Sequence, residues 1–155
     1  MKTGNIHLGN DVDISSDVSL NAVKTGNRGK IRHYTILFGS TEKPLTIGDD
    51  FFIGTHCYLN GIGGLTIGNR VTIAHGSMLF TDSGPNTSPE LQKSFPISAA
   101  PITIGNDVWI GARCTILPGV TIGDRCVIGA GSLVNADVAE GSVVAGTPAS
   151  MIRKI

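Results

Sequence analysis

Residues 104–134 read IGNDVWIGARCTILPGVTIGDRCVIGAGSLV, and an aliphatic side chain stands at every sixth position of this segment. The six positions are Ile104, Ile110, Ile116, Ile122, Ile128 and Val134. A period of six fits neither an α-helix nor a simple array of hairpins. It predicts a prism-shaped coil with three short parallel strands per turn, in which one aliphatic side chain of each strand points inward.

The same spacing recurs upstream, in Leu8–Leu20, Ile47–Leu59 and Ile67–Leu79. Because three hexads make an 18-residue coil, residues 18 apart should stack about 4.8 Å above each other. Small or apolar residues recur four places after each aliphatic and give every strand a second inward position: Val12, Phe51, Cys57, Val71, Val108, Cys114, Val120 and Cys126. We therefore predict a core built as a ladder of like residues, with the cysteines as small buried apolar groups.

Length and charge narrow the class of protein. At 155 residues the chain is expected to form one domain, residues 1–155. A net charge of zero gives no electrostatic case for nucleic acid or for an anionic membrane. The start of the chain lacks a secretion signal pattern, and no run of 18 apolar residues predicts membrane insertion, so we expect a cytoplasmic protein.

The longest break in the period lies between Leu79 and Ile104. Residues 83–101, SGPNTSPELQKSFPISAAP, contain four prolines and several turn-forming residues, which predict an irregular excursion rather than strands. Loops carried by rigid scaffolds often build functional sites. A weaker hexad at residues 23–44 includes the basic stretch KTGNRGKIRH, which is read either as a solvated edge or as a contact for an anionic substrate.

At this point the sequence resembles a known family. The run from ITIGNDVWIGARCTILPGV to SVVAGTPASMIRKI is similar to the C-terminal half of the hexapeptide-repeat acyltransferases, in particular the maltose and galactoside O-acetyltransferases and the capsule or lipopolysaccharide O-acetyltransferases. The resemblance continues upstream through LTIGNRVTIA and IGDDFFIGTHCYLN and covers about residues 45–155. It implies an all-β fold, a left-handed parallel β-helix with one long loop and a short C-terminal cap at about residues 143–155.

The resemblance also implies a homotrimer that binds acetyl-CoA in the cleft between subunits. Ala112 and Ala130 match positions whose backbone contacts the pantetheine arm of CoA, and Arg153 matches a basic position near the CoA phosphates. Trp109 matches a tryptophan beside the acyl and acceptor site, although plain packing would also explain it. No metal cofactor is expected.

One departure from the family concerns the general base. Family members use a histidine in the loop, and the matching residue here is Gly84. His56 and His75 are the two candidates to replace it, since both fall at corners of neighbouring coils. We expect His75 to act as base and His56 to contact the acceptor, while Asp82 and Asn86 are further candidates for acceptor binding.

The leading functional hypothesis is transfer of an acetyl group from acetyl-CoA to a sugar hydroxyl in surface polysaccharide synthesis. The alternative is N-acetylation of an amino sugar, free or nucleotide-linked, because an amine attacks without a strong base. Two other classes use the same prism: a zinc hydratase of the γ-carbonic-anhydrase type, which needs three histidines around the metal, and a catalytically inactive trimeric scaffold.

Overall fold

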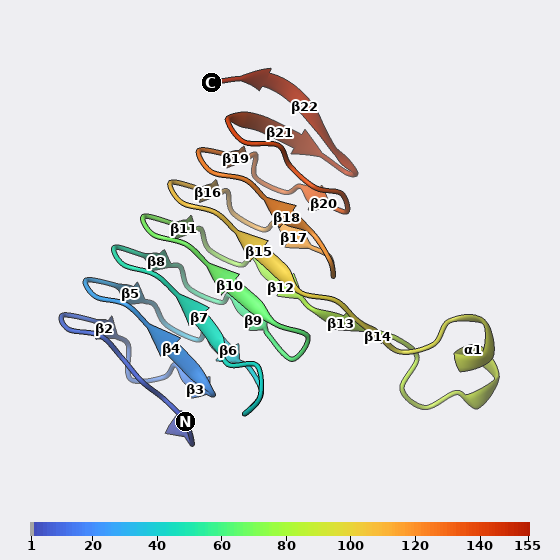
Figure 1. Cartoon of the computed structure of the whole chain (residues 1–155), viewed down its shortest axis with the longest axis horizontal. Coiled ribbons are helices and arrows are strands. Elements are labelled where there is room, and N and C mark those ends of the chain that lie inside the picture. Colours follow the sequence, from blue (N-terminus) through green and yellow to red (C-terminus); the bar gives the residue numbers. More distant parts are fainter. Residues whose placement is uncertain (1) are drawn as a thin grey trace.

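A computed structural model describes residues 2–155, with side chains from Gly4 onward. Three parallel sheets form the faces of a prism whose coils rise from the N-terminus to the C-terminus (Figure 1). In spatial order, sheet A contains β1 (Lys2–Thr3), β3 (Ser19–Asn21), β6 (Ile36–Phe38), β9 (Tyr58–Asn60), β12 (Met78–Phe80), β17 (Thr115–Ile116) and β20 (Leu133–Val134). Sheet B contains β18 (Thr121–Ile122), β15 (Ile102–Ile104), β10 (Leu65–Ile67), β7 (Leu45–Ile47) and β4 (Val23–Thr25).

Sheet C contains β2 (Asp13–Ile14), β5 (Lys30–Ile31), β8 (Phe52–Ile53), β11 (Thr72–Ile73), β16 (Trp109–Ile110), β19 (Val127–Ile128), β21 (Ser142–Gly146) and β22 (Ala149–Lys154). All pairs within the three sheets are parallel, except that β22 turns back antiparallel on β21. The parallel β-helix predicted from the hexads is thereby confirmed.

The register follows the predicted stacking. Above the excursion, Ile104 pairs with Ile122 and Ile110 with Ile128, each 18 residues apart. Ile67 pairs with Ile104 on either side of the excursion. The excursion therefore lengthens one coil without changing which residues stack in neighbouring coils.

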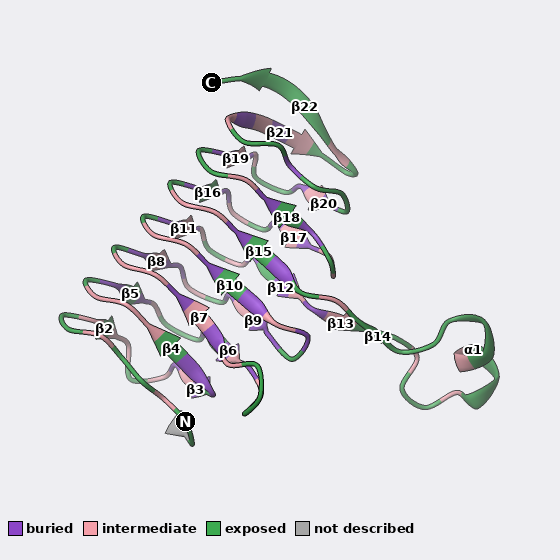
Figure 2. Ribbon diagram, viewed as in Figure 1, coloured by how far each residue is buried: buried purple, intermediate pink, exposed green. Residues whose placement is uncertain are grey.

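The prism interior is a ladder of buried aliphatic residues, seen as buried segments repeating up the coils in Figure 2. Phe51 fits inside because the coil below has Gly29, whose Cβ would lie 2.0 Å from the Phe51 ring. One predicted inward residue is wrong: Leu8 is 38% exposed, and Ile6 packs against the core instead. The first coil has a neighbour on one side only, so its register is less constrained.

The three cysteines are buried and reduced, as predicted for small core residues. Burial raises the pKa of the Cys57 and Cys114 thiols, which keeps them in the unreactive protonated form. Their thiols lie 3.2 Å and 3.1 Å from the carbonyl oxygens of Ala74 and Gly129 in the next coil.

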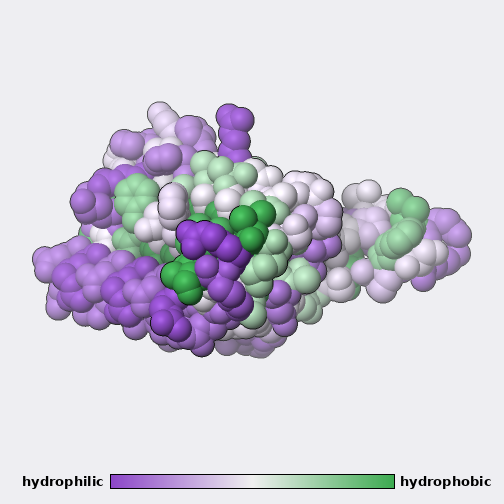
Figure 3. Space-filling model, turned by 90° about the horizontal axis from the view of Figure 1, so that it is seen from above, coloured by the Kyte–Doolittle hydropathy of each residue, from purple (hydrophilic) through white to green (hydrophobic). Residues whose placement is uncertain are grey.

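The excursion leaves the prism where sheet A passes to sheet B. It contains a short antiparallel stem, β13 (Asp82–Ser83) with β14 (Ser98–Ala99), and one helix, α1 (Pro89–Ser94). The sequence predicts no strands here, and the stem is a correction to that expectation. The tip projects from the prism and carries a hydrophobic patch (Figure 3), to which the exposed Leu91, Phe95 and Ile97 contribute. None of the helices within residues 2–155 has the length and apolar character needed to cross a membrane.

Candidate active site

Each coil turns from sheet C to sheet A through four residues, which we number corner positions 1 to 4. At this C–A edge the successive corners are residues 15–18, 32–35, 54–57, 74–77, 111–114 and 129–132. A second edge, from sheet B to sheet C, turns through four residues in the same way, at 9–12, 26–29, 48–51, 68–71, 105–108 and 123–126. The two edges share one backbone geometry, so their side chains can be compared position by position.

On the B–C edge, side-chain oxygens accept hydrogen bonds from backbone amides of the neighbouring coil. At position 2 the amide of Asp49 donates to Asn69 Oδ1 at 2.7 Å, and the amide of Asn69 donates to Asn106 Oδ1 at 2.8 Å. The same bond joins Asn27 to Asp49 and Asn106 to Asp124. Glycine at position 1 makes room for these caps, since a Cβ on Gly48 would lie 2.3 Å from Asn69 Oδ1. From Asn10 to Asn106, the position-2 amides of this edge therefore have no capacity left for a ligand.

On the C–A edge, backbone amides at position 2 remain available to a ligand. At position 2 the Thr55 amide donates to His75 Nδ1 at 2.9 Å, which is the counterpart of the caps on the B–C edge. The amides of His75, Ala112 and Ala130 follow in the same column, and none has an acceptor among residues 2–155. A row of backbone donors without protein acceptors is suited to bind an extended ligand with amide carbonyls. Ala112 and Ala130 lie in one column, as the 18-residue spacing predicts.

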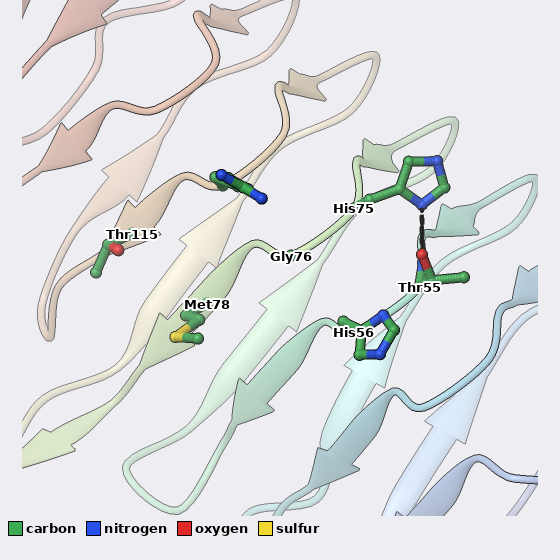
Figure 4. A pocket seen from close by; sticks show the side chains of 7 residues that line it. Thr55, His56, His75, Gly76, Met78 and Thr115 are labelled. Carbon is green, nitrogen blue, oxygen red and sulfur yellow. Dashed lines mark hydrogen bonds between the residues drawn. The ribbon is translucent and has the colours of Figure 1, made fainter.

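A pocket of about 660 Å³ opens beside this row. It is lined by Thr55, His56, His75, Gly76, Met78, Arg113 and Thr115. Figure 4 shows the two histidines on neighbouring coils, with Met78 and Thr115 on adjacent strands of sheet A. His56 and His75 therefore line one pocket.

The Thr55 amide fixes the tautomer of His75. An amide can only donate, so Nδ1 accepts and the neutral ring carries its proton on Nε2. The Thr55 hydroxyl lies 3.0 Å from the same Nδ1 (Figure 4), and the His75 ring meets the edge of Phe52 at 6.2 Å between centroids. With its lone pair engaged, His75 is arranged as a hydrogen-bond donor rather than as a base.

His56 has the opposite arrangement. It occupies corner position 3 with a left-handed φ of 55°, and within residues 2–155 neither ring nitrogen makes a hydrogen bond. Its ring lies against that of Tyr34, with centroids 5.0 Å apart and planes inclined by 31°. His56 can therefore accept a proton from a molecule in the pocket, which is the role that the sequence assigned to His75.

Trp109 and Arg153 lie on the sheet C side of the edge. Trp109 is 57% exposed on the outer face and stands in the column of Thr72 and Phe52, the residue that His75 contacts. Arg153 lies in β22, exposed at the C-terminal end of the same sheet. Three strand spacings, roughly 14 Å in all, separate its strand from β16, which leads into Ala112.

Asp82 and Asn86 do not reach the pocket of their own chain. Asp82 lies beyond the far end of β12, six residues after Gly76 and so roughly 20 Å away. Asn60 Nδ2 holds its carboxylate at 2.5 Å. Nearby, a Cβ on Gly84 would lie 2.6 Å from the Ile97 Cα. The stem therefore has no space for the family histidine at this position.

Sequence reasoning missed Thr55, Tyr34, Met78 and Arg113. The register could have found Arg113, which directly follows Ala112 and shares corner position 3 with His56. Among the residues that the structure describes, no three His, Cys, Asp or Glu side chains form a group able to hold a metal ion.

Comparison with known proteins agrees with this architecture. Residues 101–136 match the family described as bacterial transferase hexapeptide (six repeats), and residues 44–80 match the hexapeptide repeat of succinyl-transferase. The chain is 43% identical to galactoside O-acetyltransferase of Escherichia coli K12 over 119 residues, which cover 77% of this chain and 58% of that protein. It thus spans little more than half the length of this curated relative.

Two solved structures are similar over nearly the whole chain. A maltose O-acetyltransferase from Clostridium difficile 630 is 25% identical with a TM-score of 0.60, covering 100% of this chain and 68% of that one. AntD, an N-acyltransferase from Bacillus cereus in complex with dTDP and 3-hydroxybutyryl-CoA, has a TM-score of 0.85 at 22% identity, covering 97% and 84%. The two repeat matches, the 43% identity to galactoside O-acetyltransferase and the observed coils show that the chain belongs to the hexapeptide-repeat transferase family.

Proposed function

We propose that this protein is an acetyltransferase that moves the acetyl group of acetyl-CoA to a sugar in surface polysaccharide synthesis. The proposal rests on a difference between the B–C edge and the C–A edge, which share the same backbone geometry. The B–C edge has its position-2 amides capped from Asn10 to Asn106, whereas the C–A edge offers the amides of His75, Ala112 and Ala130 beside a pocket with two histidines. The relatives with O-acetyltransferase names support the same reaction. The donor is a cytoplasmic metabolite, so the proposal includes a cytoplasmic location.

In this proposal the amide row binds the pantetheine arm, and Arg153 binds the CoA phosphates. Trp109 covers the sheet C side of the ligand. Neutral His56 takes the proton of the acceptor hydroxyl while the oxygen attacks the thioester carbonyl carbon. The carbon–sulfur bond then breaks, and the CoA thiolate takes the proton from His56. His75, through Nε2–H, donates a hydrogen bond to substrate oxygen.

N-acetylation of an amino sugar is the second candidate, and the state of His75 favours it. Because Nδ1 of His75 is engaged and Gly84 leaves no room for a loop histidine, the chain offers few bases for a hydroxyl. A neutral amine attacks a thioester without such a base. AntD, which shares the fold, is an N-acyltransferase.

We further propose a homotrimer in which the two parts of the site come from different copies. The pocket lies at one end of β12 and Asp82 at the other, so one chain cannot bring them together. The outer face of sheet A is apolar, with Ile36 and Met78 more than 40% exposed and a ladder of Phe38, Tyr58 and Phe80 rings. The outer face of sheet B carries threonines in the matching positions, so self-association should use sheet A.

The test is acetyl-CoA consumption with a panel of sugars and amino sugars. We expect His56→Ala to lower kcat/KM for a hydroxyl acceptor by about 10²-fold or more, or ~3 kcal/mol, with a smaller effect for an amine. Acetyl-CoA binding should be retained. A folded protein that acetylates none of these acceptors would overturn the proposed function, and wild-type rates of His56→Ala on hydroxyls would exclude His56 as the base.

A further inference from the structure

The arginines of the two edges differ in their partners. On the B–C edge, acidic and basic residues alternate at corner position 3, all with left-handed φ: Asp11, Arg28, Asp50, Arg70, Asp107 and Arg125. Each arginine meets a carboxylate of a neighbouring coil. Arg28 Nε lies 2.7 Å from Asp50 Oδ1, Arg70 Nε lies 2.6 Å from Asp107 Oδ1, and Arg125 pairs with Glu140.

Arg113 has the same position and a φ of 55°, but on the C–A edge, and none of the carboxylates in residues 2–155 pairs with it. Its neighbours at position 3 are Gly76 below and Gly131 above. Asp17, the carboxylate at position 3 of this edge, lies four coils away, roughly 19 Å, and is held by His33. The guanidinium of Arg113 therefore has no carboxylate partner among the described residues.

The two glycines leave Arg113 room to reach the pocket. A Cβ on Gly76 would lie 3.4 Å from the Arg113 Cγ, so the stem of Arg113 passes over Gly76 toward the coil of His75. Gly131 has nothing within 4 Å of its Cβ position. All seven pocket-lining residues lack a carboxylate, and the charged or ionisable ones are Arg113, His56 and His75. A cavity with this lining attracts an anion.

The position of Arg113 indicates which substrate carries that anion. The amide row and Trp109 lie on the sheet C side of the edge, where the proposed function places the CoA arm. Arg113 shares its pocket with Met78 and Thr115, which face outward from sheet A. Arg113 therefore lines the pocket from the sheet A side of the amide row, two coils above His56.

We propose that Arg113 is a specificity-determining residue that binds an oxyanion of the acceptor, so that the natural acceptor is an anionic sugar rather than a neutral one. The inference rests on the proposed function and names the class of its second substrate. A phosphate and a carboxylate share the required chemistry, since both accept two parallel hydrogen bonds from a guanidinium. A nucleotide-linked or phosphorylated sugar supplies the first, and a uronic acid the second.

The experiment separates binding from transfer. Protein saturated with CoA is titrated by calorimetry with UDP, with glucosamine 6-phosphate and with galacturonate, in the wild type, in Arg113→Gln and in Arg70→Gln as the matched control from the B–C edge. We expect at least one of the three anions to bind the wild type and the control, and Arg113→Gln to weaken that binding by at least 10-fold. The anion that binds identifies the phosphate or the carboxylate as the group recognised.

Transfer is measured with glucosamine and glucosamine 6-phosphate, and with galactose and galacturonate. Arg113→Gln should lower kcat/KM by 10-fold or more for the anionic member of a pair and by less than 2-fold for the neutral one, with the KM for acetyl-CoA unchanged. The inference is overturned if the wild type binds none of the anions or prefers the neutral sugars. It is also overturned if Arg113→Gln acts on the KM for acetyl-CoA or dissociates the oligomer. Unimpaired transfer to neutral sugars would then leave the proposed function intact.

Discussion

The Thr55 amide decides what His75 can contribute to a reaction, because it occupies the one lone pair that the neutral ring offers. Removing the side chain therefore removes two things, a cap on Thr55 and an outward donor at Nε2. Two substitutions each restore one of these functions. Glutamine restores the donor, because its amide nitrogen reaches about as far as Nε2. Asparagine restores the cap on Thr55, because its side-chain oxygen reaches about as far as Nδ1.

We expect His75→Ala to lower kcat/KM by about 10²-fold, ~3 kcal/mol, with acetyl-CoA binding retained. His75→Gln should recover all but about 10-fold of the activity because it restores the donor. His75→Asn should keep the wild-type Tm because Asn69 caps Asp49 in this way. Steady-state kinetics and thermal melts check the three variants. A glutamine variant as inactive as the alanine variant would contradict the donor role of Nε2–H.

Ala130 allows a test of the amide row. Its side chain is exposed at corner position 2, while the inward ladder of Ile122, Ile128 and Val134 lies behind it. Ala130→Trp should fill the cleft and weaken CoA binding by 10-fold or more, with little change in Tm. Calorimetric titration of CoA measures the effect, and unchanged affinity would remove Ala130 from the donor site.

At the scale of strands and corners, the charged column of the B–C edge stabilises the stacking of coils in a pH-dependent way. Hydrogen bonds from Arg28 and Arg70 lower the pKa of Asp50 and Asp107 below the ordinary value of 3.8. A carboxylate with a lowered pKa stabilises the folded state above its unfolded pKa, and this contribution is lost as the pH falls through the folded value.

The double variant Asp50→Asn, Asp107→Asn should therefore melt at a lower temperature than the wild type at pH 7. The difference should shrink as the pH falls below 3.8, where the wild-type carboxylates also lose their charge. Thermal melts from pH 7 to about pH 2.5 measure it. A gap that stays constant over this range would show that the ion pairs do not contribute.

The strands were predictable where the hexads are clear, as in residues 47–59, 67–79 and 104–134. Ile67, Ile104 and Ile122 stack as their spacing requires, because a slip of one residue would turn the aliphatic column outward. Leu8 fails this test in the first coil, where one neighbouring coil alone sets the register. The pairing of β13 with β14 could not be predicted, because no hexad marks these two strands in the sequence.

The candidate site was predictable in position but not in chemistry. With the excursion discounted, the hexad spacing places His75 in one column with Ala112 and Ala130. The proton on His75 depends on a bond to the Thr55 amide, which requires Gly54 at position 1, since a Cβ there would lie 2.8 Å from Nδ1. Spacing carries no information about such a contact.

At the scale of the whole molecule, a single chain holds the histidine pocket at the C–A edge and the stem with Asp82 at the opposite edge of sheet A, which the proposal assigns to one shared site. A ring of three copies that pack through the apolar outer face of sheet A would place the stem of one copy at the pocket of the next. Sedimentation at micromolar concentration should then show a stable trimer, and a stable monomer would contradict the assembly.

If Asp82 binds the acceptor, as the sequence predicts, Asp82→Asn should be inactive like His56→Ala, and mixing the two variants tests whether the copies share a site. His56→Ala lacks the pocket base and keeps the stem, whereas Asp82→Asn keeps the base and alters the stem. If each site takes His56 from one copy and Asp82 from the next, random mixed trimers at equal ratio contain both wild-type residues in about a quarter of their sites. Unfolding and refolding the two variants together should therefore restore about a quarter of the wild-type activity, while each refolded alone stays inactive. Because a site built within one chain would lack one of the two residues in every copy, a mixture no more active than its components would place the whole site in a single chain.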